Sequence, residues 1–462
     1  MSKNWLIKFS ILTPNHFFNF KEIELLLIIM KHINNSSFEL FYTNHDNHDN
    51  HHIISVDINK EIYRGELYCS LLKNFTKSCL TNLNEDVFSH KKNYTRTITN
   101  LLASWFFTLY QQCDFKLDPF FPSDYKNNND IIKRILIDYC SLYKIENIDT
   151  KINNIIGDLY VSYEILLNKL AEYKKNTIIN NINNINIYKT ETTCDRNNKN
   201  ILFYNFHISN NTNKICNKLT NIINNIMIPV EQYNEMKNRF KYSTDQIDNS
   251  TNDFMDKIIW IILFRYQLLS SNNNQLAVIP KVYNKMITDF GLSVECFASA
   301  INTSLDYFCS IYYDVEKYFG SLGNFFNIIP KKGVYSFNPP YQFDVISNGI
   351  LKIINHMEST QEKLAFIITI PIWDNEGKQI MLDNNMENNN NIIKYNEFEI
   401  MNTIKKSPYF RGLRMISKDN FTYMDHNFYL FKNKTIQNTY VIVMSNYEND
   451  YIENINKINF YE

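Results

Sequence analysis

Apolar residues before residue 255 recur mainly at helical spacing, for example within residues 131–139 and 159–170. Residues 258–269 (IIWIILFRYQLL) are apolar almost all round, which predicts a buried helix. Arg265 is the odd residue in this helix, and we interpret it as an internally paired arginine in preference to a direct ligand contact. The pattern predicts a mainly α-helical N-terminal domain with Asn-rich loops over residues 1–255.

After residue 275, helical segments alternate with short apolar runs. The spacing predicts helices over 282–290, 303–312 and about 343–358, and strands over 293–297 and 334–337. Residues 364–370 (LAFIITI) form a continuous apolar run closed by Pro371, which is typical of a central parallel strand covered on both faces. This alternation is typical of a doubly wound α/β sheet, so we expect an α/β domain over residues 256–462.

Composition and charge narrow the class of protein. Apolar residues make up 44% of the 462 residues and aromatic residues 15%, which is too much burial capacity for a disordered chain. The 47 basic and 48 acidic side chains leave a net charge of -1, so no global field draws the protein to nucleic acid or an anionic membrane. Any contact with nucleic acid must therefore be local.

Asparagine is strongly over-represented in patches at 43–52, 176–200 and 374–391, which we expect to be solvated low-complexity loops. The first patch (TNHDNHDNHH) contains histidine and aspartate that could chelate a divalent metal, but a solvated loop is the simpler interpretation. The eight cysteines are scattered, without CxxC or zinc-finger spacing, which indicates reduced thiols. We predict no metal site.

Targeting features are missing from the sequence pattern. No apolar run approaches the roughly 20 residues that a membrane span needs, and residues 1–20 lack the order of a secretory signal. We expect a protein that is neither secreted nor attached to a membrane. The expected location is intracellular, in the nucleus, the cytoplasm or a viral factory.

The tetrapeptide Asn338-Pro339-Pro340-Tyr341 lies between a predicted strand and a predicted helix, where ligands bind in open parallel sheets. Its residue types suit methyl transfer to the exocyclic amine of a base, whose lone pair is delocalised into the ring. The Asn338 side-chain oxygen and the Pro339 carbonyl can each accept one amine hydrogen, and Tyr341 offers a face for stacking. The alternative is a turn in which Pro-Pro only ends a strand.

Four ordered segments carry a resemblance to a known family. They are Glu295-Cys-Phe-Ala-Ser-Ala-Ile-Asn302, Tyr318-Phe-Gly-Ser-Leu-Gly323, Asn338-Pro-Pro-Tyr341 and Ile370-Pro-Ile-Trp373. Together they resemble the catalytic region of the phosphorylated CTD-interacting factor family, which are cap-specific adenosine N6-methyltransferases. The resemblance runs from about Trp260 to about Asn446, and a strand-like segment at 438–443 resembles the family's last core strand. Tyr341 replaces the family's phenylalanine, and Ala300 replaces a proline.

The resemblance implies a Rossmann-like domain that uses S-adenosylmethionine. It carries catalytic roles over to Asn338, Pro339, Pro340 and Tyr341. It places the cofactor against Glu295, Phe297, Ser299, Asn302, Gly320, Ser321 and Gly323. Glu295 could pair with the ammonium or ribose of the cofactor, and the glycines would let the backbone come close to it. Mammalian relatives also carry a WW module that binds the polymerase tail. The four tryptophans of this chain include no pair about twenty residues apart, so we expect no WW module and no support for polymerase-tail binding.

A basic stretch with interleaved aromatic residues between 401 and 434 is the expected RNA surface, because such a mixture neutralises phosphates and holds unstacked bases. The candidate contacts are Lys331, Lys332, Arg411, Arg414 and Lys418. The alternative is a solvated face over core aromatics.

The leading hypothesis is an S-adenosylmethionine-dependent enzyme that methylates N6 of adenosine in RNA. The expected target is the 2'-O-methyladenosine next to the cap at the 5' end of mRNA. A DNA adenine methyltransferase would use the same loop chemistry on a flipped base. A non-catalytic RNA-binding subunit that keeps the fold is the third alternative, and the intact loop at Asn338 disfavours it. The oligomeric state and the pocket for 7-methylguanine are not indicated by the sequence.

Overall fold

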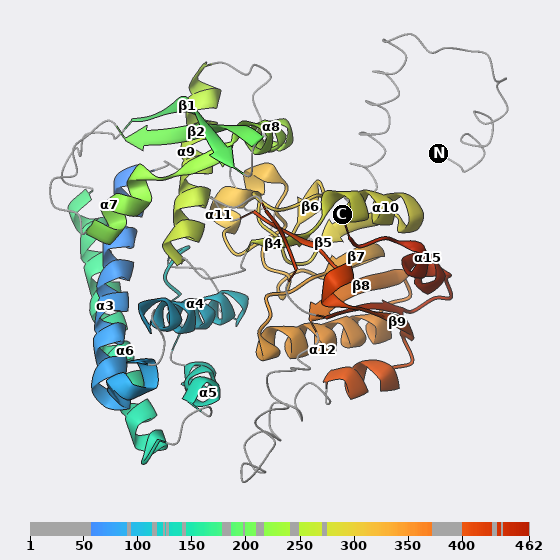
Figure 1. The fold of residues 1–462 in the computed structure, drawn as a ribbon, viewed down its shortest axis with the longest axis horizontal. Helices are drawn as coiled ribbons and strands as arrows, with labels where there is room; N and C mark the ends of the chain where they lie inside the picture. The colour runs from blue at the N-terminus through green and yellow to red at the C-terminus, as the bar shows by residue number, and fades with distance from the viewer. Residues whose placement is uncertain are drawn as a thin grey trace.

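The structure is a computed structural model (Figure 1). It describes residues 57–89, 94–112, 118–122, 125, 129–140, 145–177, 186–196, 199–208, 217–240, 249–269, 275–371, 400–426, 432–435 and 438–461. The Asn-rich patches predicted at 43–52 and 374–391 lie outside these residues, and with them the histidine cluster.

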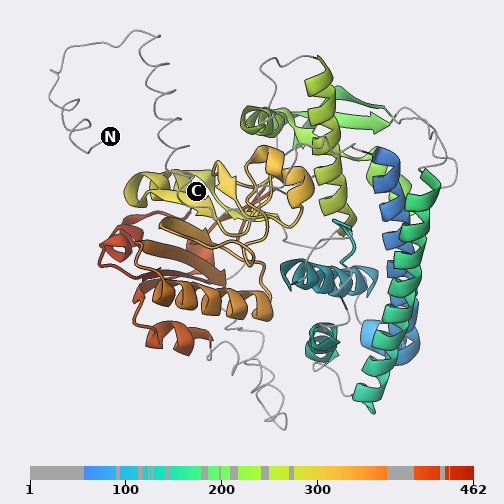
Figure 2. The ribbon, with the colours of Figure 1, turned by 180° about the vertical axis from the view of Figure 1, so that it is seen from behind.

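The first half of the described chain is mainly helical. Its helices are α3 (Ile58–Ser89), α4 (Tyr94–Gln112), α5 (Asn129–Cys140), α6 (Ile148–Thr177), α7 (Asn217–Asn224), α8 (Val230–Arg239) and α9 (Asn249–Leu269). The long helices α3 and α6 run side by side, with α4 between them and the sheet (Figures 1 and 2). Aromatic side chains such as Trp105 and Trp260 fill one apolar core that these helices share. The helical prediction for this half is confirmed at residues 131–139, 159–170 and 258–269.

One part of this half differs from the prediction. The Asn-rich segment 176–200, expected to be a loop, contains strand β1 (Ile187–Arg196), which pairs antiparallel with β2 (Lys199–Ile208). Strand β3 (Met227–Pro229) completes a small three-stranded sheet. Ile187 is buried against the helical core, so a few apolar positions suffice to hold a hairpin that the asparagine-rich composition concealed.

The second half contains a six-stranded mixed sheet. Its strands are β5 (Leu292–Glu295), β6 (Tyr307–Phe308), β7 (Gly333–Phe337), β8 (Leu364–Pro371), β9 (Phe410–Ile416) and β12 (Thr439–Ser445). Their order across the sheet is β6-β5-β7-β8-β12-β9. The first four are parallel, and β12 is antiparallel to both of its neighbours. The predicted strands at 334–337 and 364–370 are confirmed.

Both faces of this sheet are covered by helices. Helices α10 (Pro280–Phe290) and α15 (Tyr451–Lys457) lie on one face, and α12 (Phe343–Ser359) lies on the other (Figures 1 and 2). Successive residues of β8 alternate between two apolar clusters, with Ile367 in one and Ile368 in the other. A strand that feeds two cores has no polar face, which is why its sequence is a continuous apolar run. The fold is therefore mixed α/β.

The predicted helix over 303–312 is wrong. Within it, Tyr307 and Phe308 form β6, which pairs parallel with β5. The short helix α11 (Tyr313–Glu316) and a 3-10 turn, η2 (Lys317–Phe319), follow. Aromatic residues suit a pleated strand, and pairing with β5 overrides the helical spacing of the segment.

A smaller sheet adjoins the main one. Strand β10 (Tyr423–Asp425) pairs antiparallel with both β4 (Leu276–Val278) and β11 (Lys432–Lys434). Another 3-10 turn, η4 (Lys418–Asn420), precedes β10. Part of the segment predicted to contact RNA, strand β10, is thus hydrogen-bonded to β4, the strand just before α10.

Arg265 of α9 confirms the interpretation of an internally paired arginine. Its guanidinium donates to Glu61 of α3 (Nη2 to Oε1, 2.7 Å) and to Asp314 of α11 (Nη1 to Oδ1, 2.8 Å). Arg265 is buried, with 1% of its surface exposed. The pair with Asp314 connects the helical half to the segment after β6, and the pair with Glu61 joins α9 to α3. None of the described helices is long and apolar enough to cross a membrane.

Candidate active site

The strand order reverses at β5, and this position defines a crevice. The chain leaves the carboxyl end of β5 to form β6 on one side and later returns to form β7 on the other. In open α/β sheets, ligands bind at such a reversal, beyond the carboxyl ends of the strands. The loops that follow Glu295 and Phe337 both begin there.

A cavity of about 320 Å³ lies at this position. Three segments after the strands line it, at residues 296–302, 309–311 and 338–342, and side chains of the helical half close it. The helical contributors are Asn100, Ser104, Phe107 and Tyr266. The volume falls in the range of small-molecule sites. The sheet and the helical half therefore build the site together.

Asn338, Pro339, Pro340 and Tyr341 all border the cavity, as the motif predicted. The carbonyl of Pro340 accepts a hydrogen bond from the Gln342 amide at 2.7 Å. In the described part of the chain, neither the Asn338 side chain nor the Pro339 carbonyl has a hydrogen-bond partner. Two acceptors next to each other are thus available to a ligand.

Gln342 fixes this loop to the helical half. It is the N-cap residue of α12, and its side-chain nitrogen donates to the Ser104 carbonyl at 3.2 Å. Its side-chain oxygen accepts from the Thr108 hydroxyl at 2.6 Å. Both partners lie on α4, so that helix sets the position of the loop that carries Asn338.

Tyr341 packs beside Tyr423 with its ring inclined by 71° and the ring centroids 6.3 Å apart. Burial, together with the Tyr423 hydroxyl, raises the pKa of Tyr341 well above its ordinary value. The phenol is therefore neutral, and its ring offers an uncharged wall to the cavity.

The predicted cofactor residues fall into two groups. Phe297, Ser299 and Asn302 line the cavity. The Ser299 amide donates to the Asn302 side-chain oxygen at 2.7 Å, and the Ser299 hydroxyl donates to Gln275 at 2.8 Å. This loop is a compact turn with a fixed polar surface.

Glu295 is placed differently from its predicted role. Its Oε1 accepts from the Thr303 hydroxyl and the Ser304 amide, both at 2.7 Å, and from the Leu305 amide at 3.2 Å. The residue is 3% exposed and does not line the cavity. Its carboxylate holds the 303–305 segment in place, so a direct contact with a cofactor has no support from this geometry.

Gly320, Ser321 and Gly323 also lie away from the cavity lining. Gly320 has a φ of 101°, and a Cβ atom there would lie 2.0 Å from the Asp306 carbonyl oxygen. The close backbone approach predicted for a ligand is thus made to the chain itself. The Ser321 hydroxyl lies 2.7 Å from that of Ser310, which does line the cavity.

The basic residues do not form one surface at the cavity. Lys331 and Lys332 precede β7, whereas the cavity lies beyond its carboxyl end, and a five-residue strand spans roughly 16 Å. Arg414 donates to the carbonyls of Ile455 and Ile458 at 2.7 and 2.8 Å, at the end of α15.

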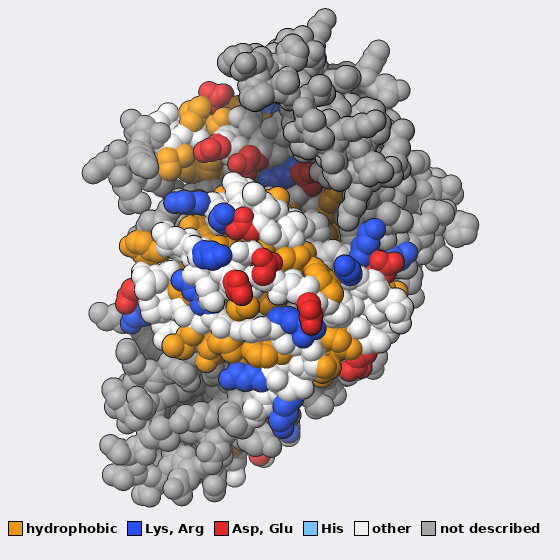
Figure 3. Space-filling view, turned by 90° about the vertical axis from the view of Figure 1, so that its right-hand side faces the viewer, with side chains coloured by type: hydrophobic (Ala, Val, Ile, Leu, Met, Phe, Trp, Pro, Cys, Tyr) orange, Lys and Arg blue, Asp and Glu red, His pale blue; other side chains and the backbone are white. Residues whose placement is uncertain are grey.

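The two remaining candidates are Arg411 and Lys418. Arg411 donates to the carbonyls of Pro408 and Tyr447 at 2.9 and 3.3 Å, and Lys418 is exposed beyond the end of β9. On the side of the molecule that looks out from β9 and α15, basic and acidic side chains are interspersed (Figure 3). The alternative of a solvated face over core aromatics thus fits Arg411 and Arg414 better than phosphate binding does.

Sequence reasoning missed the contribution of the helical half. Asn100 and Ser104 lie one turn apart on the apolar helix α4, and this pair of polar residues was the available signal. Asn100 Oδ1 is enclosed and has no hydrogen-bond partner in the described part of the chain. It is a third acceptor at the cavity, after the Asn338 side chain and the Pro339 carbonyl.

The fold and cavity define an α/β protein with a candidate ligand site at the switch point of its main sheet. A family model described as "Phosphorylated CTD interacting factor 1 WW domain" matches residues 235–426. Two curated relatives are named mRNA (2'-O-methyladenosine-N(6)-)-methyltransferase. The human protein is 31% identical and the mouse protein 30% identical over 140 residues. These stretches cover 29% of this chain, which spans only 20% of the length of each relative.

The family match corrects one prediction and supports another. It contradicts the expectation that the chain has no WW module, because the matching model is described as a WW domain. The search for two tryptophans about twenty residues apart was too narrow, since the match extends over most of the sheet. The expected lack of polymerase-tail binding therefore has no support. The resemblance to the phosphorylated CTD-interacting factor family is supported.

Proposed function

We propose that this protein is an S-adenosylmethionine-dependent methyltransferase that acts on N6 of adenosine in RNA, with the cap-adjacent 2'-O-methyladenosine of mRNA as its target. The named activity of the two relatives supports this proposal. Helices on both faces of the sheet and the reversal of strand order at β5 support a Rossmann-like domain. We further infer that a mainly helical domain precedes the methyltransferase domain. The boundary expected at residue 255 falls within α9, so we place it after Leu269.

The observation that carries the proposal is the pair of unused acceptors at the cavity, on Asn338 and Pro339. An exocyclic amine of a base is a poor nucleophile because its lone pair is delocalised. If the Asn338 oxygen and the Pro339 carbonyl accept its two hydrogens, the nitrogen is held with its lone pair turned toward the reacting carbon. Acceptors that are fixed beforehand lower the barrier without reorganising.

The cavity also fits the cofactor. S-adenosylmethionine, when bound, supplies an electrophilic methyl group. Phe297, Ser299 and Asn302 would hold it, since they form the wall that follows β5. The enclosed Asn100 oxygen, which has no partner in the described part of the chain, marks a place where a ligand donor is missing. A mixture of aromatic and polar groups suits a nucleoside.

Among the predicted RNA contacts, Lys418 has the best position. It follows the carboxyl end of β9, which is the same edge of the sheet as the cavity because β9 runs parallel to β8. We infer that RNA approaches along this edge.

Transfer of labelled methyl groups tests the proposed function. The substrates are capped RNA that begins with 2'-O-methyladenosine, the same RNA without a cap, and single-stranded DNA. Asn338→Ala should lower the rate more than 100-fold, because one fixed acceptor is worth about 3 kcal/mol of the barrier. Asn224→Ala, at the exposed end of α7, is the matched control and should leave the rate unchanged.

The substrates separate the alternatives. Label on capped RNA alone supports the cap-adjacent target, and label on DNA supports the DNA adenine methyltransferase instead. If wild type binds S-adenosylmethionine but labels none of the three, the non-catalytic alternative gains support. Full activity of Asn338→Ala would overturn the proposed chemistry.

A further inference from the structure

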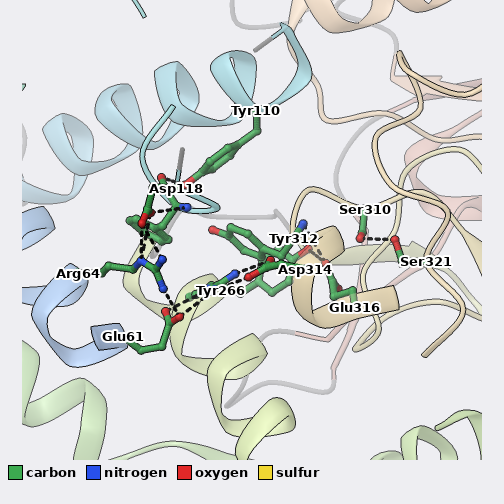
Figure 4. A network of polar contacts seen from close by, with 12 residues as sticks. Glu61, Arg64, Tyr110, Asp118, Tyr266, Ser310, Tyr312, Asp314, Glu316 and Ser321 are labelled. Carbon is green, nitrogen blue, oxygen red and sulfur yellow. Dashed lines mark hydrogen bonds and ion pairs between the residues drawn. The ribbon is translucent and has the colours of Figure 1, made fainter. Parts of the chain in front are cut away.

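A buried carboxylate lies directly behind the cavity wall. Glu316, the last residue of α11, has 0% of its surface exposed. Its Oε1 accepts from the Ala300 amide at 2.7 Å, and its Oε2 accepts from the Tyr266 hydroxyl at 3.1 Å and the Tyr312 amide at 3.3 Å. Figure 4 shows Glu316 beside Tyr312, with Ser310 and Ser321 nearby.

These contacts fix three separate parts of the cavity. Tyr266 belongs to α9 of the helical half and lines the cavity. Ala300 lies in the turn between Ser299 and Asn302, which both line it. The Tyr312 amide, two residues after the lining residue Ser310, also donates to Glu316. One carboxylate therefore joins walls that come from α9, from the loop after β5 and from the segment after β6.

Every hydrogen-bond donor described on Glu316 is uncharged. Arg265, on the same helix as Tyr266, is held by Glu61 and Asp314 instead (Figure 4). Burying a carboxylate that has only hydrogen bonds, and no positive partner, lowers the stability of the folded protein. If Glu316 served folding alone, a neutral side chain of similar shape at this position would make the folded protein more stable.

We propose that Glu316 is a positioning residue for the cofactor side of the cavity, where its carboxylate holds the 299–302 turn and Tyr266 in their binding positions. This inference rests on the proposed function for the identity of the ligand. The contacts themselves do not depend on that identity.

Protonation of Glu316 should make ligand binding depend on pH, whereas a residue that served packing alone would produce no such dependence. Burial raises the pKa of Glu316 from 4.5 to about 7, although its hydrogen bonds oppose that shift. The hydrogen bonds from Ala300 and Tyr266 favour the charged form of Glu316, so protonation weakens them. An opening of the turn that leaves Glu316 buried therefore becomes easier at lower pH.

The other groups around Glu316 keep their charge near neutral pH. Burial raises the pKa of Tyr266 from α9, of Tyr312 beside α11 and of Tyr110 from α4 well above ordinary values. The pKa of Arg265 is also raised, because Asp314 and Glu61 outweigh its burial. Asp314 forms an ion pair with Arg265 at 2.8 Å.

Two substitutions test the charge of Glu316 and its hydrogen bond from the Ala300 amide separately. Glu316→Gln keeps the shape and removes the charge, and it should fold because it also removes the cost of burying that charge. Ala300→Pro removes only the amide donor. Proline suits this position, since the Asn302 amide bonds the Ser299 carbonyl and Ala300 is the second residue of that turn. Glu358→Gln, exposed near the end of α12, is the control.

The experiment measures amide hydrogen exchange of residues 296–303 in the ligand-free full chain, corrected for intrinsic exchange, and the Kd for S-adenosylmethionine, both from pH 5.5 to 8.5. In wild type, protection should fall and Kd should rise about tenfold as the pH drops through 7, the size expected for a charge-assisted hydrogen bond. Glu316→Gln should stay at the weak level at every pH, and Ala300→Pro should weaken the Kd at pH 8.5. Glu358→Gln should follow wild type.

A pH profile of Glu316→Gln that matches wild type would overturn the inference, as would unchanged protection in wild type. If the exchange results agree but S-adenosylmethionine binds at no pH, the positioning role stands and the proposed function fails. The two proposals are thus tested separately.

Discussion

The sharpest test of the buried charges that join the two halves is Glu61→Gln. The Glu61 carboxylate bonds Arg64 on its own helix and receives two bonds from Arg265, at 2.7 and 3.0 Å. Burial alone would raise the pKa of Glu61, but Arg265 and Arg64 outweigh burial and lower the pKa from 4.5 to about 2. The ionised form therefore stabilises the folded protein.

The size of this stabilisation follows from the shift in pKa. At 1.36 kcal/mol for each pKa unit, the folded protein gains about 3 kcal/mol at neutral pH. Because the folded pKa is the lower one, this stability is present above pH 4.5 and is lost as the pH falls toward 2. Glu61→Gln should cost about 3 kcal/mol at pH 7, and the cost should shrink by about 1 kcal/mol at pH 4.

Urea unfolding at pH 7 and at pH 4 measures both quantities. Glu66→Gln, on the same helix, is the matched control, because burial raises the pKa of Glu66 and its charge does not stabilise the fold. We expect that control to be neutral or slightly stabilising. Equal effects of the two substitutions, or a cost of Glu61→Gln that does not change with pH, would refute the reasoning.

Two further substitutions test the loop contacts and the role of the basic residues. Gln342→Leu removes both hydrogen bonds between the Asn338 loop and α4, so the free energy of unfolding should fall by about 1 to 3 kcal/mol and single-turnover methyl transfer by roughly tenfold; an unchanged transfer rate would contradict the positioning role of α4. Arg414→Leu removes two bonds at the end of α15 and should lower stability by about 1 to 3 kcal/mol in urea unfolding. It should leave the salt dependence of RNA binding unchanged, whereas a slope smaller by about one would make Arg414 a phosphate contact.

The elements that the sequence predicted correctly are those whose local pattern agrees with their surroundings. The run 364–371 is apolar throughout because both faces of β8 are covered, and the spacing of α12 follows its one buried face. The helix expected at 303–312 failed because its aromatic pair, Tyr307 and Phe308, pairs with β5, a contact that local spacing cannot reveal. The hairpin at 187–208 was concealed by asparagine for a similar reason.

In the candidate site too, local sequence patterns were predicted correctly and tertiary contacts were not. Asn338 to Tyr341 could be placed from the sequence, because a motif between a strand and a helix fixes its own position in a parallel sheet. Glu295 could not be assigned in this way, since its three hydrogen bonds come from residues of a loop whose path the sequence did not give. The role of α4 also required the tertiary structure, because Asn100 and Ser104 are far from the motif in sequence and only the fold brings them to the cavity.

The position of β12 between β8 and β9 has a consequence for synthesis on the ribosome. One edge of the apolar strand β8, which ends at Pro371, is paired only when Thr439 to Ser445 have emerged. At about 5 to 20 residues per second, this interval lasts roughly 4 to 15 s. During that time the nascent chain carries an open apolar edge that can pair with another chain. Production of this protein should therefore depend on chaperones that bind nascent chains.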